Sequence, residues 1–178
     1  MKHVIKVLGI VMLLAACSTT KVLSDIDKGA DFDGYKTYAW SDVEEPLNDD
    51  YPQYDNSLNR KRWKNAIDAA MQNEGYTLVE ENADLQVDYH IQFEHNAVVD
   101  HEYHNNPRDY YESMKPTSVY QYDEGIMTIH LIDLERNQVV WQAVLTKVLD
   151  ISQLDKADSN IRKVVNKAFE KFHSQIAE

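Results

Sequence analysis

Residues 83–95 (ADLQVDYHIQFEH) alternate between apolar and polar side chains, and this alternation constrains the fold more than any other feature of the sequence. The apolar set is Leu85, Val87, Tyr89, Ile91 and Phe93. Successive side chains of a β-strand point to opposite faces of its sheet, so the pattern predicts a strand with one buried and one wet face. Such a strand is typical of an antiparallel sheet that is covered on one side only.

Two amphipathic helices are predicted to cover that side. The first spans residues 58–74, with Ser57 or Asn56 as its cap and Gly75 just past its end. Its apolar face holds Trp63, Ile67, Ala70 and Met71. The second spans residues 155–176 and repeats apolar residues at helical spacing. This stripe comprises Ile161, Val164, Val165, Ala168, Phe169, Phe172 and Ile176.

Four further strands complete the expected order β-β-α-β-β-β-α. Two are predicted at residues 21–26 and 35–40, and two lie within residues 124–149 around a turn near residues 135–138. The inward faces of the last pair are Met127, Ile129 and Leu131, followed by Val139, Trp141, Ala143 and Leu145. We therefore expect an α+β domain, with a mostly antiparallel sheet of about five strands and two helices packed on one face. Residues 41–57 and 96–119 each contain two prolines and are predicted to be long loops.

The N-terminus has the pattern of a bacterial lipoprotein signal. Lys2 and Lys6 precede a short apolar run that is too short to span a bilayer as a helix, and two alanines then precede Cys17, the single cysteine. The Leu-Ala-Ala-Cys stretch resembles a lipobox, in which the signal is cut between Ala16 and Cys17 and the cysteine is acylated. The alternative is an ordinary secretory signal with a chance cysteine. We expect residues 1–16 to be the signal, 17–30 a lipidated N-terminus and tether, and 31–178 a single domain.

Lipidation would place the protein on a membrane without a spanning helix, because two or more acyl chains give stable anchoring. Ser18 follows the cysteine, where Asp would favour the inner membrane by analogy with the Gram-negative sorting rule, so we expect the outer membrane and a domain facing the periplasm. Without Lys2 and Lys6 the chain has 16 basic and 30 acidic side chains, a formal charge of −14 compared with −12 for the whole sequence. This charge disfavours nucleic acid as a partner.

Several stretches, in order, resemble the DUF4136 family of bacterial envelope lipoproteins. They are ADFDGYKTYAW at residues 30–40, Glu74-Gly75-Tyr76 at the end of a helix, ADLQVDYHI at residues 83–91, and the set Gly125, Asp133, Val140 and Trp141. The similarity covers residues 22–176. It departs from the family pattern at His130, where Asp is frequent, and at Ala143, where Gly is frequent. The resemblance implies a fold and an envelope location, and it implies no activity.

The stretch of residues 93–112 carries the most suggestive chemistry. His95, His101 and His104 lie among carboxylates, as a zinc or copper site requires if the side chains converge. The alternative is a solvated loop without a metal. Three tyrosines of this stretch are candidates for binding a partner, namely Tyr103, Tyr110 and Tyr111. Tyrosines beside carboxylates can stack on sugar rings or anchor a protein.

Catalytic motifs are weak in this sequence. It has no Gly-x-Ser-x-Gly elbow and no glycine-rich phosphate loop, so we expect neither catalytic residues nor a cofactor. The main hypothesis is a non-catalytic, lipid-anchored envelope protein that binds an envelope protein or a cell-wall component. The alternatives are a metal- or small-ligand-binding module that uses the His-rich loop 95–104, and a hydrolase with an unrecognised carboxylate site.

Overall fold

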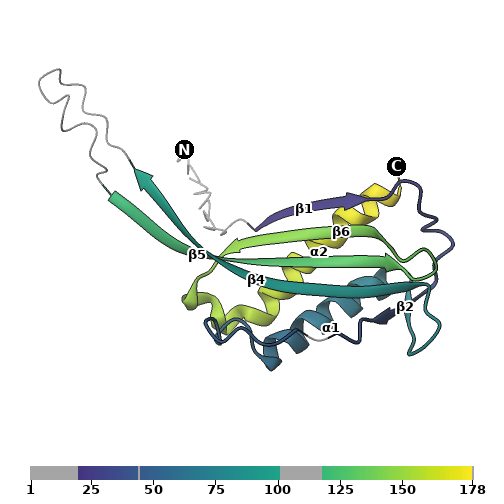
Figure 1. Cartoon of the computed structure of the whole chain (residues 1–178), viewed down its shortest axis with the longest axis horizontal. Coiled ribbons are helices and arrows are strands. Elements are labelled where there is room, and N and C mark those ends of the chain that lie inside the picture. The colour runs from purple at the N-terminus through teal and green to yellow at the C-terminus, as the bar shows by residue number, and fades with distance from the viewer. Residues whose placement is uncertain (1–19, 44, 101–117, 178) are drawn as a thin grey trace, which may run out of the picture.

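The described residues form a six-stranded sheet with two α-helices on one face (Figure 1). The computed structural model describes residues 20–43, 45–100 and 118–177. The strands are β1 (Lys21–Ile26), β2 (Thr37–Trp40), β3 (Thr77–Leu78), β4 (Leu85–Asp100), β5 (Ser118–Asp133) and β6 (Gln138–Val148). The helices are α1 (Ser57–Asn73), the short 3-10 helix η2 (Ile151–Lys156) and α2 (Ala157–Ile176).

The strands lie in the order β1-β6-β5-β4-β2-β3. β2 pairs in parallel with both β3 and β4, and the other neighbours are antiparallel. The prediction of a mostly antiparallel sheet with two helices is confirmed, and the strand number is corrected from about five to six. The additional strand β3 is only two residues long, which is too short for any alternation to reveal it in the sequence.

The start of the sheet lies within the segment that was expected to be a tether. β1 pairs with β6 along its whole length, from Lys21 opposite Thr146 to Ile26 opposite Trp141. Residues 21–26 are therefore part of the sheet.

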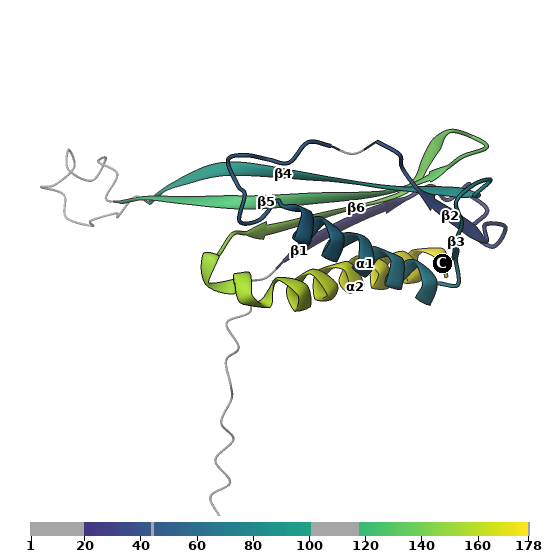
Figure 2. The same ribbon diagram turned by 90° about the horizontal axis from the view of Figure 1, so that it is seen from below.

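Both helices pack against the same face of the sheet, and the core lies between them and the strands (Figure 2). The alternation in β4 places Leu85 and Val87 in this core, as predicted. The apolar stripe of α2 is buried except at Ile176. The largest fully buried side chains are Trp141, Tyr38, Phe172, Ile67, Met71, Leu85, Ile129 and Leu131. The described residues include no helix with the length and apolar content that a membrane span needs.

The ends of α1 follow local rules that the sequence already contained. The Asn56 side chain accepts a hydrogen bond from the backbone N–H of Asn59, which satisfies one of the free donors at the helix start. After the helix, Gly75 has a φ of +95°. The N–H groups of Gly75 and Tyr76 donate to the carbonyls of Gln72 and Met71, the two bonds of a Schellman motif. Glycine is favoured here because other residues are strained at positive φ.

A β-bulge in β6 alters the predicted inward face of that strand. Trp141 lies opposite Leu131 and Val139 lies opposite Ile132, so Val140 is the extra residue. Val140 and Trp141 are both buried, whereas Val139 is 47% exposed. The prediction that Val139 points inward is therefore wrong, because the bulge shifts the alternation by one residue.

Candidate functional site

β4 and β5 extend well beyond the rest of the sheet as a two-stranded ribbon (Figure 1). They stay paired from Leu85 opposite Asp133 to Asp100 opposite Ser118, whereas β6 ends at Val148 opposite Glu124. We call residues 96–100 and 118–122 the ribbon. Within the described part of the chain, no third strand pairs with it. Residues 96–100 and 118–119 were predicted to be loop, and this prediction is wrong.

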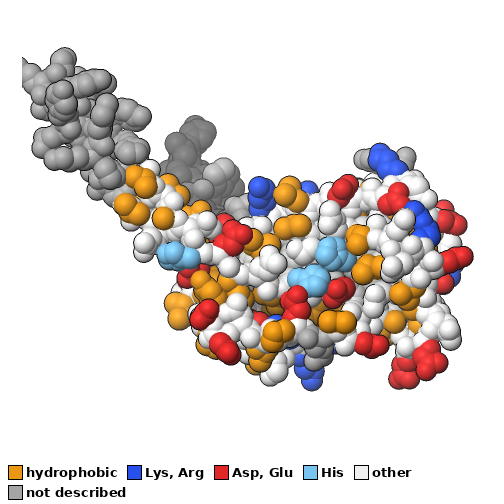
Figure 3. Space-filling model, in the orientation of Figure 1, with side chains coloured by type: hydrophobic (Ala, Val, Ile, Leu, Met, Phe, Trp, Pro, Cys, Tyr) orange, Lys and Arg blue, Asp and Glu red, His pale blue; other side chains and the backbone are white. Residues whose placement is uncertain are grey.

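Apolar side chains are exposed on both faces of the ribbon. Val98 lies opposite Tyr120, and Val99 lies opposite Val119. These four side chains are between 47% and 61% exposed. Because successive residues of a strand face opposite ways, each face carries one of the two pairs. Figure 3 shows hydrophobic side chains gathered on this projecting part of the molecule.

Large apolar side chains exposed together on a projecting element are typical of interaction surfaces. Ribbons of two strands are only marginally stable in water, and their outer edges present unpaired backbone groups. A partner that covered the apolar pairs or added a strand would therefore stabilise the ribbon.

Most of the residues predicted to form a site lie outside the described part of the chain. They are Cys17, His101, His104, Tyr103, Tyr110 and Tyr111. His95 is described, and it lies on β4 and not in a loop, which corrects the expectation of a loop over residues 95–104. Its Nδ1 is 2.7 Å from Asp123 Oδ1 on β5, in an exposed pair.

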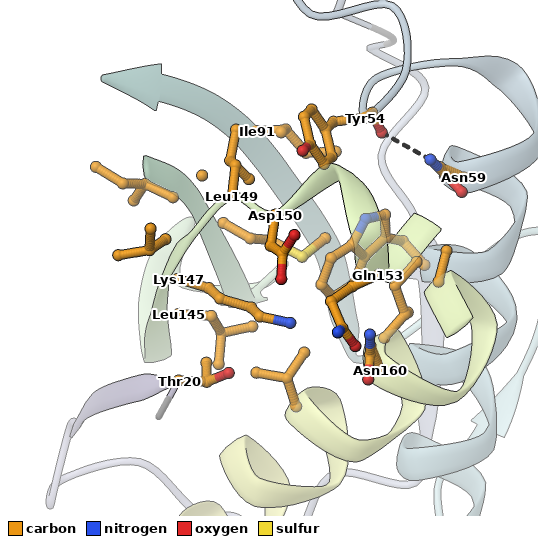
Figure 4. A pocket seen from close by; sticks show the side chains of 18 of the residues that line it. Thr20, Tyr54, Asn59, Ile91, Leu145, Lys147, Leu149, Asp150, Gln153 and Asn160 are labelled. Atoms are coloured by element: carbon orange, nitrogen blue, oxygen red, sulfur yellow. Dashed lines mark hydrogen bonds between the residues drawn. The ribbon is translucent and has the colours of Figure 1, made fainter. Parts of the chain in front are cut away.

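An apolar cavity of about 150 Å³, partly open to the surface, lies at the base of the ribbon (Figure 4). Its walls come from the inner face of the sheet, from α1 and from the start of α2, and they include Trp63, Phe93 and Ile161. Thr20, just before β1, also lines it. An apolar cavity of this size can hold a small apolar group.

A glycine keeps part of this cavity open. Gly125 lies opposite Phe93 in the β4–β5 ladder, and a β-carbon at Gly125 would lie 3.0 Å from Leu149 Cδ2. The sequence did not reveal the cavity, because its walls combine residues from several elements that are distant along the chain.

A cluster of polar residues lies on the face of the sheet that points away from the helices, which we call the open face. Asp88 and His90 are on β4, and His130 on β5 lies directly across from Asp88. One potential ligand atom from each residue lies within 4.8 Å of the others, and the rings of His90 and His130 have centroids 5.6 Å apart. Figure 3 shows histidine and acidic side chains side by side on this face.

His90 is held between two carboxylates. Its Nδ1 is 2.6 Å from Glu45 Oε1, and its Nε2 is 3.1 Å from Asp88 Oδ2. The hydrogen bond with Glu45 raises the pKa of His90 above its ordinary value, although partial burial opposes the shift. Burial lowers the pKa of His130, and the neighbouring His90 adds to this effect. The sequence prediction overlooked this cluster, although Asp88 and His90 have the spacing that puts them on one face of a strand.

A buried carboxylate network lies at the end of the sheet farthest from the ribbon. Asp133 is 4% exposed and accepts hydrogen bonds from the Tyr35 hydroxyl and from the backbone N–H groups of Glu135 and Arg136. Burial alone would raise the pKa of Asp133, but these hydrogen bonds outweigh it and lower the pKa below its ordinary value. Arg136 also forms an ion pair with Asp27 at 2.9 Å.

The carboxylate of Asp84 likewise accepts several hydrogen bonds, and these hold the start of β2 in place. Its Oδ2 accepts from the backbone N–H groups of Lys36 and Thr37 and from the Thr37 hydroxyl, each at 2.8 Å. Tyr35, Asp84 and Asp133 all belong to stretches on which the family resemblance depends. Their contacts are within the fold, so these residues have structural roles.

Comparisons with solved structures find matches at low sequence identity. One is a PDZ domain protein from Parabacteroides distasonis, with 14% identity, a TM-score of 0.49 and coverage of 82% of this chain. This chain covers only 35% of that protein. The PelC dodecamer from Paraburkholderia phytofirmans has 13% identity and a TM-score of 0.46, with coverage of 84% of this chain and 94% of that one. A minor lipoprotein from Acinetobacter baumannii has 10% identity and a TM-score of 0.37, with coverage of 80% and 92%.

The comparison with curated proteins finds no significant match. A family model does match, and it covers residues 22–172, from the second residue of β1 to Phe172 in α2. It is described as a domain of unknown function, DUF4136. This match covers most of the chain and agrees with the resemblance found in the sequence, so the chain belongs to the DUF4136 family.

Proposed function

We propose that this chain is a non-catalytic lipoprotein of the bacterial envelope, anchored through acyl chains on Cys17 and facing the periplasm from the outer membrane. Its role would be to bind an envelope protein or a cell-wall component through the ribbon. The observation that carries the binding role is the paired exposure of apolar side chains on both faces of a projecting two-stranded element.

The anchor is supported by the sequence. The single cysteine follows a basic stretch, an apolar run and two alanines, which is the order of a lipoprotein signal. The acidic charge of the chain would repel anionic headgroups, so acyl chains are a more suitable means of attachment than electrostatics.

The binding role is supported by the chemistry of the ribbon. Its exposed groups include valines and a tyrosine, which bury apolar area on binding. Its outer edges have backbone donors and acceptors that an extended partner segment could pair with, in the manner of strand addition.

Cys17→Ala tests the anchor. We expect the change to abolish incorporation of labelled palmitate and to release the protein from the membrane fraction. Ser18→Asp serves as a control, since it keeps the label and should shift the protein toward the inner membrane. Unchanged labelling of Cys17→Ala would contradict the proposed anchor.

A photo-crosslinking residue at Val99 tests the ribbon in intact cells, with the same residue at Val139 as a matched control. Both positions are valines on strands with 47% exposure, but only Val99 is on the ribbon. We expect a discrete crosslinked species from position 99 alone, and we expect Val98→Thr with Tyr120→Thr to weaken it. Equal crosslinking from both positions, or none from any ribbon position, would contradict the proposed role.

A further inference from the structure

We propose that Asp88, His90 and His130 form a binding site for a zinc-class divalent metal ion on the open face of the sheet. This site differs from the predicted His95, His101 and His104 set, and it does not depend on the proposed anchor or ribbon.

The ladder of β4 and β5 brings the three side chains together. Asp88 lies opposite His130, and His90 is two residues along the same strand, so all three point to one face. Zinc binds nitrogen and oxygen ligands at about 2.0–2.2 Å, which places neighbouring ligands of a tetrahedral site about 3.4 Å apart. Asp88 Oδ2 and His90 Nε2 are already 3.1 Å apart, and the ligand atoms of the whole set lie within 4.8 Å. Small side-chain rotations would complete the site.

Glu45 prepares His90 for this role. Its carboxylate is 2.6 Å from His90 Nδ1, so in the neutral ring Nδ1 carries the proton that Glu45 accepts. The lone pair of Nε2 then faces the Asp88 carboxylate, and these two electron-rich atoms repel each other unless a cation lies between them. A carboxylate that accepts from the distal N–H of a ligating histidine is the usual support of a zinc site. The cation can be a proton or a metal ion, and the test below separates the two.

The other groups at the site are also compatible with a metal ion. Gln142 on β6 lies directly opposite His130, so its side chain is on the same face of the sheet. The two carboxylates, of Asp88 and Glu45, balance the charge of a divalent ion. Two imidazoles with one carboxylate favour zinc, copper or nickel over magnesium and calcium, which prefer oxygen ligands. Three protein ligands leave the fourth position of a tetrahedral site, which water can occupy because none of the described helices covers this face.

Zinc binding by the metal-free mature lipoprotein in detergent tests the proposal, with isothermal titration and metal content after gel filtration as the measurements. We expect one equivalent of Zn²⁺, an upward shift of the thermal midpoint with Zn²⁺, and no shift with Mg²⁺. His130→Ala and Asp88→Asn should both lose this equivalent. Glu45→Gln should weaken it by about 10- to 100-fold, as is typical of a lost outer carboxylate.

Two control variants exclude the histidines of the set that the sequence predicted. His95→Ala removes a histidine that is also paired with a carboxylate across the same two strands. His101→Ala with His104→Ala removes the rest of the predicted set. Both controls should keep the equivalent. Asp88→Asn keeps the shape of the side chain, so it remains informative if His130→Ala fails to fold.

Three results would overturn the proposal. The first is wild-type protein that retains no stoichiometric Zn²⁺, which would leave a proton as the cation between His90 and Asp88. The second is zinc that remains bound in both His130→Ala and Asp88→Asn. The third is zinc that is lost in a control variant and kept in Asp88→Asn.

Discussion

The Tyr35 hydroxyl donates a hydrogen bond to the Asp133 carboxylate across 98 residues of sequence, with 2.7 Å between Tyr35 Oη and Asp133 Oδ2. This bond connects the segment before β2 to the end of β5. Asp133 is buried, so each hydrogen bond to it offsets part of the cost of removing a charge from water.

Tyr35→Phe should therefore lower the free energy of unfolding by about 1–3 kcal/mol, the range for a hydrogen bond to a charged group or for a buried acceptor that loses its donor. Urea unfolding measures this directly. Tyr120→Phe on the exposed ribbon is the control and should stay within about 0.5 kcal/mol of wild type. Equal effects of the two changes would show that the Tyr35–Asp133 bond contributes nothing.

Asp84 should make stability depend on pH in the acid range. The backbone N–H groups of Lys36 and Thr37 and the Thr37 hydroxyl hold the pKa of Asp84 below its ordinary value of 3.8. The unfolded chain therefore binds a proton at Asp84 more readily than the folded chain does. The contribution of Asp84 to the free energy of unfolding is present above pH 3.8, and it is lost as the pH falls through the pKa of Asp84 in the folded state.

We expect Asp84→Asn to be less stable than wild type at pH 7, and the difference to shrink as pH falls below about 4. Urea unfolding at pH 7, 5, 4 and 3 measures the difference. A difference that stays constant over this range would mean that the charge of Asp84 has no part in holding β2.

The bulge in β6 predicts opposite outcomes for two adjacent valines. Val140→Lys would place a charge in the core and should cost several kcal/mol or prevent folding, as burial of an unpaired charge does. Val139→Lys should stay within about 0.5 kcal/mol, since this side chain is exposed. Unfolding curves of the two variants check the bulge. A regular strand with Val139 inside would give the reverse order.

Phe172 should be among the most costly core positions. It is fully buried, and its ring centroid lies 5.1 Å from that of Trp141 and 5.4 Å from that of Phe32. Phe172→Ala should cost about 3–5 kcal/mol, which is a large part of the stability of an ordinary domain. Ile151→Ala on η2 is the exposed comparison and should have little effect in the same thermal or urea experiment.

Periodicity revealed those parts of the fold in which a single element determines the pattern. The alternation that ends at Phe93 identified β4, and the stripe that includes Val165 and Phe169 identified α2. Gly75 marked the end of α1 because only one backbone conformation suits that position. The two-residue β3 and the bulge at Val140 produce no regular pattern, so the sequence could not show them.

The candidate sites depend on strand register, which a single sequence does not contain. Asp88 and His130 are far apart in the chain and meet only because β4 and β5 pair in one particular register. His95 was grouped with His101 and His104 by closeness in sequence, whereas in the fold its described neighbour is Asp123. The ribbon was missed because two prolines within residues 96–119 suggested loop over the whole stretch.

The position at which β1 begins determines how close the ribbon of an anchored protein would lie to the membrane. Thr20 leads into β1 at the end of the sheet where Lys21, Thr146 and Ile126 lie abreast, which is also the end from which the ribbon projects. Only Ser18 and Thr19 separate Cys17 from Thr20, and the three Cα–Cα steps between them span about 10 Å when the chain is fully extended. An acylated Cys17 would then confine the ribbon to a thin layer of the periplasm next to the bilayer. A partner in the same membrane would meet it at a high effective concentration, so a modest intrinsic affinity would be enough for a stable pair.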